Sequence, residues 1–146
     1  MAIVTREWKR EDVAAVAAID AACFLEDIWT AENYQKQFSG AVFCGVVVEL
    51  DGQPVGYVCG TLVCDDAEIL RIAVKPEFQK RGLGGKLLDA FLQTVKEKGG
   101  AHVFLEVRKS NQAARTLYES RVFVITRERK KYYADGEDAL EMKKEL

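Results

Sequence analysis

The stretch ILRIAVKPEFQKRGLGGKLLDAFL, residues 69–92, decides the fold. Residues 69–74 form an apolar run of strand length that only Arg71 interrupts, and Pro76 prevents the chain from continuing as a paired strand. From Leu83 onwards, apolar residues recur at helical spacing, at positions 83, 87, 88, 91, 92 and 95. The stretch therefore predicts a strand, a glycine-rich loop and a helix that begins at the loop.

The glycine-rich loop has a chemical meaning because it opens a helix. The first N–H groups of a helix lack intrahelical partners and lie at the positive end of its dipole, so glycines there let an anion approach closely. Lys80, Arg81 and Lys86 add positive charge around the loop. We therefore expect it to bind phosphate. The alternative is a glycine-rich connection that leads into an exposed basic helix start.

Two common phosphate-binding motifs do not fit this loop. A P-loop requires G-x-x-x-x-G-K-[ST], but lysine stands five residues before Gly85 and leucine follows Lys86. A dinucleotide fingerprint requires glycine at position 87, which is leucine. The pattern Gln79-x-x-Gly82-x-Gly84 instead resembles the pyrophosphate-binding signature of the GNAT family of acetyl-CoA-dependent N-acetyltransferases.

This resemblance implies that acetyl-CoA is the cofactor. The loop would hold its pyrophosphate, and backbone groups at the end of the preceding strand would hold its pantetheine arm. The implied cofactor-binding residues in this region are Ile72, Ala73, Val74, Gln79, Lys80, Arg81, Gly82, Leu83, Gly84, Gly85 and Lys86.

Composition limits the class of protein. The 146 residues fit a single domain, 1–146, and apolar and charged fractions of 49% and 30% are ordinary for a soluble globular protein. A net charge of −2 argues against general nucleic-acid binding. No apolar run approaches the roughly 20 residues that span a bilayer, and the first residues lack a signal-peptide core. We expect a cytoplasmic protein without membrane association.

The four cysteines include no C-x-x-C pair, and the only histidine, His102, is far from them in sequence. Reduced, mostly buried thiols are favoured, and we expect no metal site.

The remaining patterns predict the order of elements. Asp12 is a candidate cap for the first helix, and Asp51-Gly52 is a strong hairpin signal. A stop at residues 98–100 ends the helix that follows the glycine-rich loop. Strands are expected at 3–8, 42–50, 54–64, 68–74, 101–107, 122–126 and 139–142, with further helices at 13–23, 30–38 and 112–120.

Glu106 interrupts the apolar run 101–107, which is typical of a central strand covered on both faces. A carboxylate there is costly unless it is paired, and burial raises a carboxyl pKa towards the range useful to a base. Glu106 is therefore a candidate proton acceptor. The alternative is a structural ion pair with Arg71, Arg108 or Arg115. Tyr118 lies on the following helix, and its phenol either points to the same cleft or packs in the core.

The run LEVRKSNQAARTLYES, residues 105–120, closely resembles the RimI branch of the GNAT family, whose members acetylate the N-terminal amine of a ribosomal protein. The resemblance covers about residues 69–142 and implies that Glu106 is the general base, Tyr118 the general acid and Asn111 a cofactor contact. It also implies an α/β (α+β) fold of GNAT type, in which about four helices flank a central mixed, mostly antiparallel sheet. That sheet would be splayed near Val74 and Glu106, so that acetyl-CoA and the amine enter from opposite sides, and an amide near Val74 would steady the developing negative charge.

The chain departs from this family pattern at two places. Members usually have Leu-Gly-Phe after the Glu-Ser pair, but this chain has Arg121-Val122-Phe123, so a turn that exploits the positive φ of glycine must be made otherwise. The Pro-Trp that is common in the early loop is Ile28-Trp29 here.

Aromatic and acidic side chains gather in two segments that the resemblance places near the acceptor amine. They could attract a cationic chain end and wall a narrow slot; alternatively, Phe24 and Trp29 simply pack against the core. The candidate substrate-binding residues are Phe24, Glu26, Asp27, Trp29, Tyr132 and Tyr133.

We therefore predict an acyltransferase that transfers acetyl directly to a protein N-terminal α-amine, with a ribosomal protein as candidate partner. A small amine such as a polyamine, or a lysine side chain, is the alternative acceptor. A non-catalytic CoA-binding regulatory module and a ligand-free interaction domain are alternatives of other classes.

Overall fold

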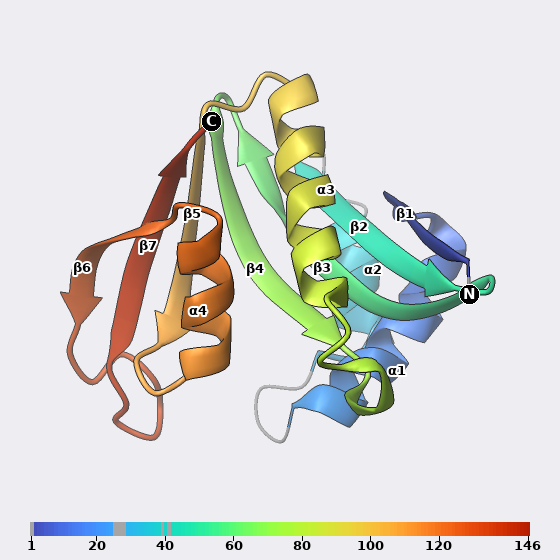
Figure 1. Ribbon diagram of the computed structural model, residues 1–146, viewed down its shortest axis with the longest axis horizontal. Coiled ribbons are helices and arrows are strands. Elements are labelled where there is room, and N and C mark those ends of the chain that lie inside the picture. The colour runs from blue at the N-terminus through green and yellow to red at the C-terminus, as the bar shows by residue number, and fades with distance from the viewer. Residues whose placement is uncertain (1, 25–28, 39, 41) are drawn as a thin grey trace.

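The computed structural model of the protein describes residues 2–24, 29–38, 40 and 42–146. In these residues, one seven-stranded sheet is flanked by four α-helices (Figure 1). The elements in chain order are β1 (Ile3–Glu7), α1 (Val13–Cys23), α2 (Ala31–Phe38), β2 (Phe43–Leu50), β3 (Gln53–Val63), β4 (Asp66–Val74), α3 (Leu83–Glu97), β5 (His102–Arg108), α4 (Gln112–Ser120), β6 (Val124–Arg129) and β7 (Ala139–Glu145).

The sheet is mixed and mostly antiparallel, which confirms the predicted fold class. Its strand order is β1-β2-β3-β4-β5-β7-β6, and among the described strands only β4 and β5 pair in parallel. A parallel pair needs a crossover connection, and α3 provides it. The predicted hairpin is also confirmed, since Asp51 and Gly52 both adopt positive φ, 51° and 84°.

The sheet splays between β4 and β5. Their pairing ends at Ile69 opposite Leu105, and beyond this point the two strands diverge in Figure 1. On the other side of β4, Gly60 lies opposite Ile69 and Cys59 opposite Arg71, so Leu70 is an additional residue in the register. This bulge turns the side chains of β4 that follow it to the opposite face. The splay therefore begins a few residues earlier on β4 than the predicted position near Val74.

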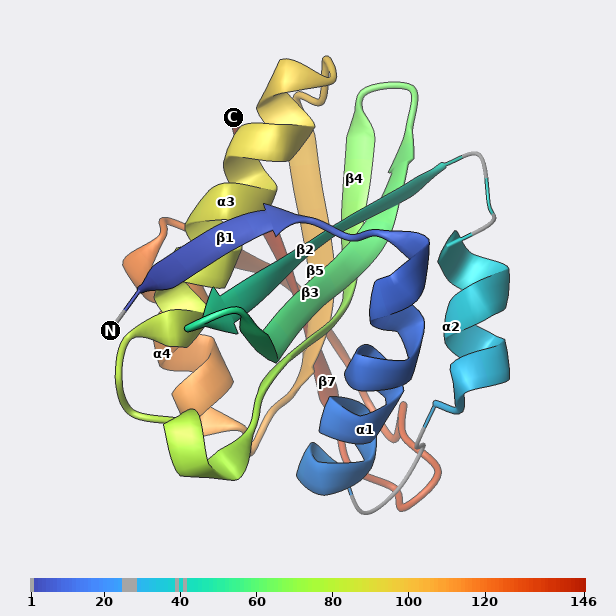
Figure 2. The same cartoon turned by 90° about the vertical axis from the view of Figure 1, so that its right-hand side faces the viewer.

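Helices cover the two faces of the sheet unequally. Figure 2 shows α3 and α4 on one face and α1 and α2 on the other. The larger core joins α3 to all of the central strands, and the smaller core lies under α1 and α2, around residues of β2, β3 and the end of β4. Since α1 and α2 reach only that half, no described helix covers the second face of the opposite half of the sheet, and we call this face the open face.

This unequal cover corrects one expectation. The prediction that β5 is covered on both faces is wrong, because its side chains alternate between buried and half-buried along the whole strand. Val103, Leu105 and Val107 face α3 and α4, whereas Glu106 points to the open face. The apolar run in the sequence does not reveal that one face of β5 is open, because the apolar Phe104 lies on that open face and makes the run nearly continuous.

Two local predictions also change. Asp12 precedes α1 but does not cap it, since its carboxylate accepts hydrogen bonds from the Lys9 amide and from Arg6 instead. The strand predicted at 122–126 is β6, Val124–Arg129. It starts later because Val122 itself adopts φ 68°, and so makes the turn that family members make with glycine.

All four cysteines are free, and two of them, Cys44 and Cys59, are buried, whereas Cys23 is half-buried and Cys64 exposed. Within the described part of the chain, no helix combines the length and hydropathy that crossing a membrane requires.

Candidate active site

A cavity of about 600 Å³ opens where β4 and β5 diverge. It extends from α4 on one face of the sheet to the end of α1 on the other. Its walls include predicted cofactor, catalytic and acceptor residues, namely Phe24, Ile72, Glu106, Asn111, Tyr118 and Tyr133. The structure therefore brings together residues that are up to about a hundred positions apart in sequence.

Glu106 lies half-buried in this cavity. Its Oε1 is 3.7 Å from Arg129 Nε, and its buried Oε2 has no hydrogen-bond partner among the described residues. The Tyr132 hydroxyl also contacts this carboxylate, and this hydrogen bond and the charge of Glu106 raise the pKa of Tyr132. One carboxylate oxygen thus remains available for a proton.

The ion pair that is the alternative interpretation of Glu106 has a different partner from the three arginines considered. The candidate arginines bond elsewhere: Arg71 to Asp20, Arg108 to Asp135 and Glu137, and Arg115 to the Lys109 carbonyl. The actual partner, Arg129, comes from β6, which sequence spacing did not place near β5.

A second hollow of about 340 Å³ adjoins Glu106 on the open face of the sheet. Glu106 lines both hollows, and Glu68 and Glu141 join it here, together with Arg129. Partial desolvation and the negative charges of Glu106 and Glu141 raise the pKa of Glu68. The surroundings of Glu106 on this side are therefore rich in negative charge, which favours a cation.

Tyr118 faces the cavity from α4 and is only 5% exposed. Its ring packs edge-on against Phe123, with centroids 5.6 Å apart. Burial, with a smaller contribution from Tyr133, raises the pKa of Tyr118, so the phenol keeps its proton at neutral pH. It can serve as a proton donor but not as a base.

The glycine-rich loop forms the predicted helix start. Gly82 precedes α3 with φ 79°, and apart from Gly82 and its two chain neighbours no heavy atom lies within 4 Å of where a Cβ would be. Lys86 donates a helical hydrogen bond to the Gly82 carbonyl at 3.2 Å, so the amides between them precede the regular ladder. Lys80 and Arg81 are exposed beside the loop. An open, glycine-lined helix start with adjacent cations fits a pyrophosphate group.

The loop is joined to the end of β4. The Gln79 side-chain amide donates to the Val74 carbonyl at 2.9 Å, and Cys23 Sγ donates to the same oxygen at 3.2 Å. The Val74 carbonyl is therefore occupied by these two donors. Ile72 lines the cavity, whereas the side chain of Ala73 packs under α1 and α2, so the pantetheine contacts of this segment stay predictions.

Helix α4 connects the loop to the cavity. Leu117 lies 3.6 Å from the position of a Cβ on Gly84, while Ala114 and Tyr118 on the same helix line the cavity. Asn111 directly precedes this helix, and its side-chain oxygen accepts a hydrogen bond from the Ala114 amide at 3.1 Å. Asn111 thus caps α4 with its side-chain oxygen, and its side-chain NH₂ is the group left for a cofactor.

The predicted acceptor residues lie in two places. Phe24 lines the cavity, while the Trp29 ring packs on Tyr34 with centroids 5.2 Å apart, as the packing alternative expected. Glu26 and Asp27 lie outside the described residues. Tyr133 lines the cavity beneath the Arg108 guanidinium, which is 4.1 Å from its ring centroid.

Sequence reasoning missed several residues of the cavity wall, including Cys23, Arg71, Asp135 and Glu137. It also missed Asp20, which binds Arg71. A usable signal was present, since Asp20 is the only charged residue of the otherwise apolar α1 and Arg71 is the only one between residues 69 and 74. A lone charge in an apolar element indicates a buried polar contact.

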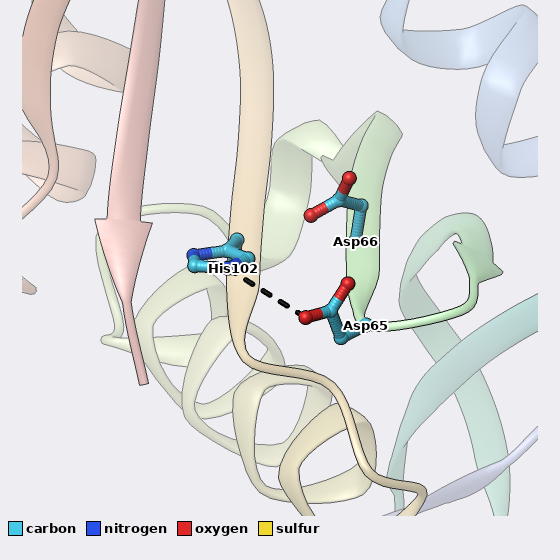
Figure 3. A group of neighbouring side chains, drawn as sticks. All are labelled: Asp65, Asp66 and His102. Carbon is cyan, nitrogen blue, oxygen red and sulfur yellow. Dashed lines mark ion pairs between the residues drawn. The ribbon is translucent and has the colours of Figure 1, made fainter.

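A group of possible metal ligands lies at the other end of β4 and β5. Asp65, Asp66 and His102 have ligand atoms within 4.8 Å of one another (Figure 3). His102 Nε2 is 3.8 Å from Asp65 Oδ2, and its Nδ1 is hydrogen-bonded to Glu145. His102 therefore contacts one carboxylate within the group, Asp65, and one outside it, Glu145.

Comparisons with known proteins agree with this geometry. Residues 14–123 match the model of the Acetyltransferase (GNAT) family. A Bacillus subtilis (strain 168) protein with the provisional name of ribosomal protein bS18-alanine N-acetyltransferase is 38% identical over 140 residues, which cover 94% of this chain and 91% of that protein. The ribosomal protein bS18-alanine N-acetyltransferase of Escherichia coli (strain K12) is 34% identical over 117 residues, 78% of each chain.

The fold is also that of a solved enzyme. The crystal structure of the ribosomal-protein-S18-alanine N-acetyltransferase from Escherichia coli superimposes with a TM-score of 0.91 at 29% identity. The alignment covers 99% of this chain and 94% of that one.

Proposed function

The chain belongs to the GNAT family of acetyltransferases, and on this premise we propose that it acetylates the α-amine at a protein N-terminus. Members of this family use acetyl-CoA. The observation that carries the proposal is the presence of Glu106 and Tyr118 in one cavity at the splay of the sheet. We also propose that residues 1–146 act as one domain in the cytoplasm, with a ribosomal protein as acceptor.

Bound acetyl-CoA supplies a thioester carbonyl that an amine can attack. Glu106 accepts the proton that the ammonium must lose, directly or through a water, so that the nitrogen becomes nucleophilic. As the C–N bond forms and the C–S bond breaks, Tyr118 donates its proton to the departing sulfur, and the second proton that the acylated nitrogen must lose returns to the Tyr118 oxygen. The loop at Gly82–Gly85 holds the pyrophosphate, with Lys80, Arg81 and Lys86 adding charge, and Asn111 and the end of β4 hold the remaining arm.

The chemistry of the amine supports an N-terminal acceptor. An α-amine has an ordinary pKa near 7.7–8.0, against about 10.4 for lysine, so far more of it is neutral at pH 7. A half-buried carboxylate suits this easier deprotonation. Phe24 and Tyr133 narrow the acceptor side of the cavity, and the acidic hollow beside Glu106 attracts a cationic chain end.

A competition among acceptors tests this function. Purified protein receives acetyl-CoA with peptides that begin with Ala or Ser, with the same peptides blocked at the N-terminus but carrying lysine, or with spermidine, and released thiol is measured. We expect preferential acetylation of the free N-termini. Preference for blocked lysine peptides or for spermidine overturns the acceptor assignment, and absence of thiol release with every amine overturns the catalytic function.

The cofactor site has its own test. Gly84→Glu should abolish acetyl-CoA binding in calorimetry, because a carboxylate would face the phosphates beside Leu117. Gly84→Ala is the matched control, since its Cβ meets Leu117 at an ordinary 3.6 Å and binding should persist. Unchanged affinity in a folded Gly84→Glu protein would remove the loop from the site.

A further inference from the structure

Asp20 is a fully buried carboxylate that the proposed reaction does not use. Its Oδ1 accepts hydrogen bonds from the Tyr34 hydroxyl at 2.5 Å, the Tyr57 hydroxyl at 2.7 Å and Arg71 Nη1 at 2.8 Å. Its Oδ2 accepts from the Trp29 amide at 2.8 Å. The carboxylate thus joins α1, α2, β3, β4 and the segment that precedes α2.

The ionised form of the Asp20 carboxylate is stabilised by its partners. Burial opposes ionisation, but the hydrogen bonds from Tyr34, Tyr57 and the Trp29 amide, with the charge of Arg71, keep the pKa of Asp20 below its ordinary value. A buried ion pair is weak support for a purely stabilising role, because apolar residues of similar volume often serve as well. A role in placing Arg71 is the stronger interpretation.

Arg71 carries this network to the cavity wall. Its guanidinium lies 4.7 Å from the ring centroid of Phe24 and 4.7 Å from that of Trp29. It lines the cavity beside Phe24, because the bulge at Leu70 directs it towards α1 and away from α3. The planar group therefore occupies space on the acceptor side that a larger acceptor residue would need.

We propose that Arg71 determines acceptor specificity and that Asp20 is the positioning residue that holds it. The clamped guanidinium and Phe24 form a fixed wall that admits a small first residue of the acceptor and excludes a branched or aromatic one. This proposal rests on the proposed N-terminal acetylation, and it concerns the acceptor side of the cavity only.

The double variant Asp20→Asn/Arg71→Ala tests the wall, because it removes both charges and leaves none unpaired in the interior. Thiol release is measured with peptides that begin with Ala or with Leu, and acetyl-CoA affinity by calorimetry. We expect the KM for the Ala peptide to rise about tenfold and the preference for Ala over Leu to fall about tenfold, within the range that pocket size gives. The acetyl-CoA Kd should stay within about twofold of the parent. Single Asp20→Asn should change KM in the same direction but less.

Asp12→Asn is the matched control. Asp12 is 5% exposed and forms an ion pair with Arg6 at 2.8 Å. The variant therefore breaks a comparable ion pair at the opposite end of α1, away from the cavity. It should lower stability without changing KM or the Ala preference. An equal change in this control, or an unchanged preference in the folded double variant, overturns the proposal. If the double variant does not fold, unchanged selectivity in Asp20→Asn has the same meaning.

The proposed function and this inference fail differently. If the parent protein acetylates only blocked lysine peptides, the N-terminal assignment fails. The wall is then tested with lysine peptides that carry Ala or Leu next to the lysine, and an unchanged preference in the variants overturns it.

Discussion

The two halves of the sheet differ in how many of their faces are covered. In β2 and β3, residues 44–48 and 55–60 are buried without interruption, because α3 packs on one face and α1 with α2 on the other. In β5, burial alternates residue by residue. The half that contains β2 and β3 therefore has a core on both faces, while β5 in the other half presents every second side chain to the open face.

This difference separates stability from chemistry. Glu106, Arg129 and Glu141 can carry charge because they lie on the open face, whereas the same groups in the middle of β2 would meet a core on both sides. Tyr118 differs from these charged residues, because it is buried and reaches the cavity from the covered face. The comparison predicts that substitutions on the open face change rate more than stability.

The largest effect should come from the proposed acid and base. Glu106→Gln and Tyr118→Phe should each lower kcat by roughly 10²- to 10⁴-fold, with little change in acetyl-CoA affinity, because each removes a proton transfer. Steady-state kinetics and calorimetry measure the two quantities. Glu97→Gln, an exposed carboxylate at the end of α3, is the control and should behave like the parent. Parental turnover in both site variants would show that positioning alone carries the rate.

A pair of neighbours on β5 tests the comparison through stability. Leu105 is 1% exposed on the covered face, so Leu105→Ala should cost about 2–5 kcal/mol in the free energy of unfolding. Phe104 is half-buried on the open face, and Phe104→Ala should cost clearly less despite the larger side chain. Denaturant titration gives both values. Equal costs would mean that the open face is covered in solution.

Val122→Gly should stabilise the protein. Val122 is exposed and holds φ 68°, a left-handed conformation that costs a branched residue about 1–2 kcal/mol. Glycine removes this strain but adds freedom to the unfolded chain, so the net gain should be about 0.5–1 kcal/mol. Thermal unfolding should show a higher Tm than the parent. Val124→Gly, also exposed but within β6, is the control and should lower the Tm.

The smallest effect concerns Glu68. Partial desolvation and the charges of Glu106 and Glu141 raise the pKa of Glu68, so the folded state binds its proton more tightly than the unfolded chain does. This group therefore lowers stability as the pH rises above the ordinary carboxyl range. Because Glu68 is exposed, solvent screening limits the gain in Glu68→Gln at pH 7 to a few tenths of a kcal/mol. The difference should vanish near pH 4 in denaturant titrations. A variant that is less stable at pH 7 would contradict the sign.

Most of the fold could be predicted because its signals are local. The stretch 69–92 contains its own strand, turn and helix signals, and the run 105–120 supplies Glu106, Asn111 and Tyr118 in one segment. The helices predicted in these two stretches occur in the structure, as α3 at Leu83–Glu97 and α4 at Gln112–Ser120.

The missed contacts join elements that are far apart in the sequence. Arg129 reaches Glu106 only because β7 lies between β5 and β6, and Asp20 reaches Arg71 only because α1 packs over the end of β4. A lone charge such as Asp20 indicates a buried polar contact, but the spacing of residues in the sequence does not identify the partner of Asp20 or of Glu106. The one-sided cover of β5 was also hidden, because coverage depends on where α1 and α2 lie and not on the composition of β5 itself.

The place of β7 in the sheet has a consequence for synthesis. β6 is made before β7 but, among the described strands, pairs only with β7, so β6 lacks a described neighbour in the sheet until β7 has emerged and inserted beside β5. On the ribosome, β1 to β4 can already assemble with α3 before the β5-β7-β6 side of the sheet is complete. The surroundings of Glu106 are therefore completed last, and a nascent chain acquires its glycine-rich loop at the start of α3 before the proposed acceptor side is finished.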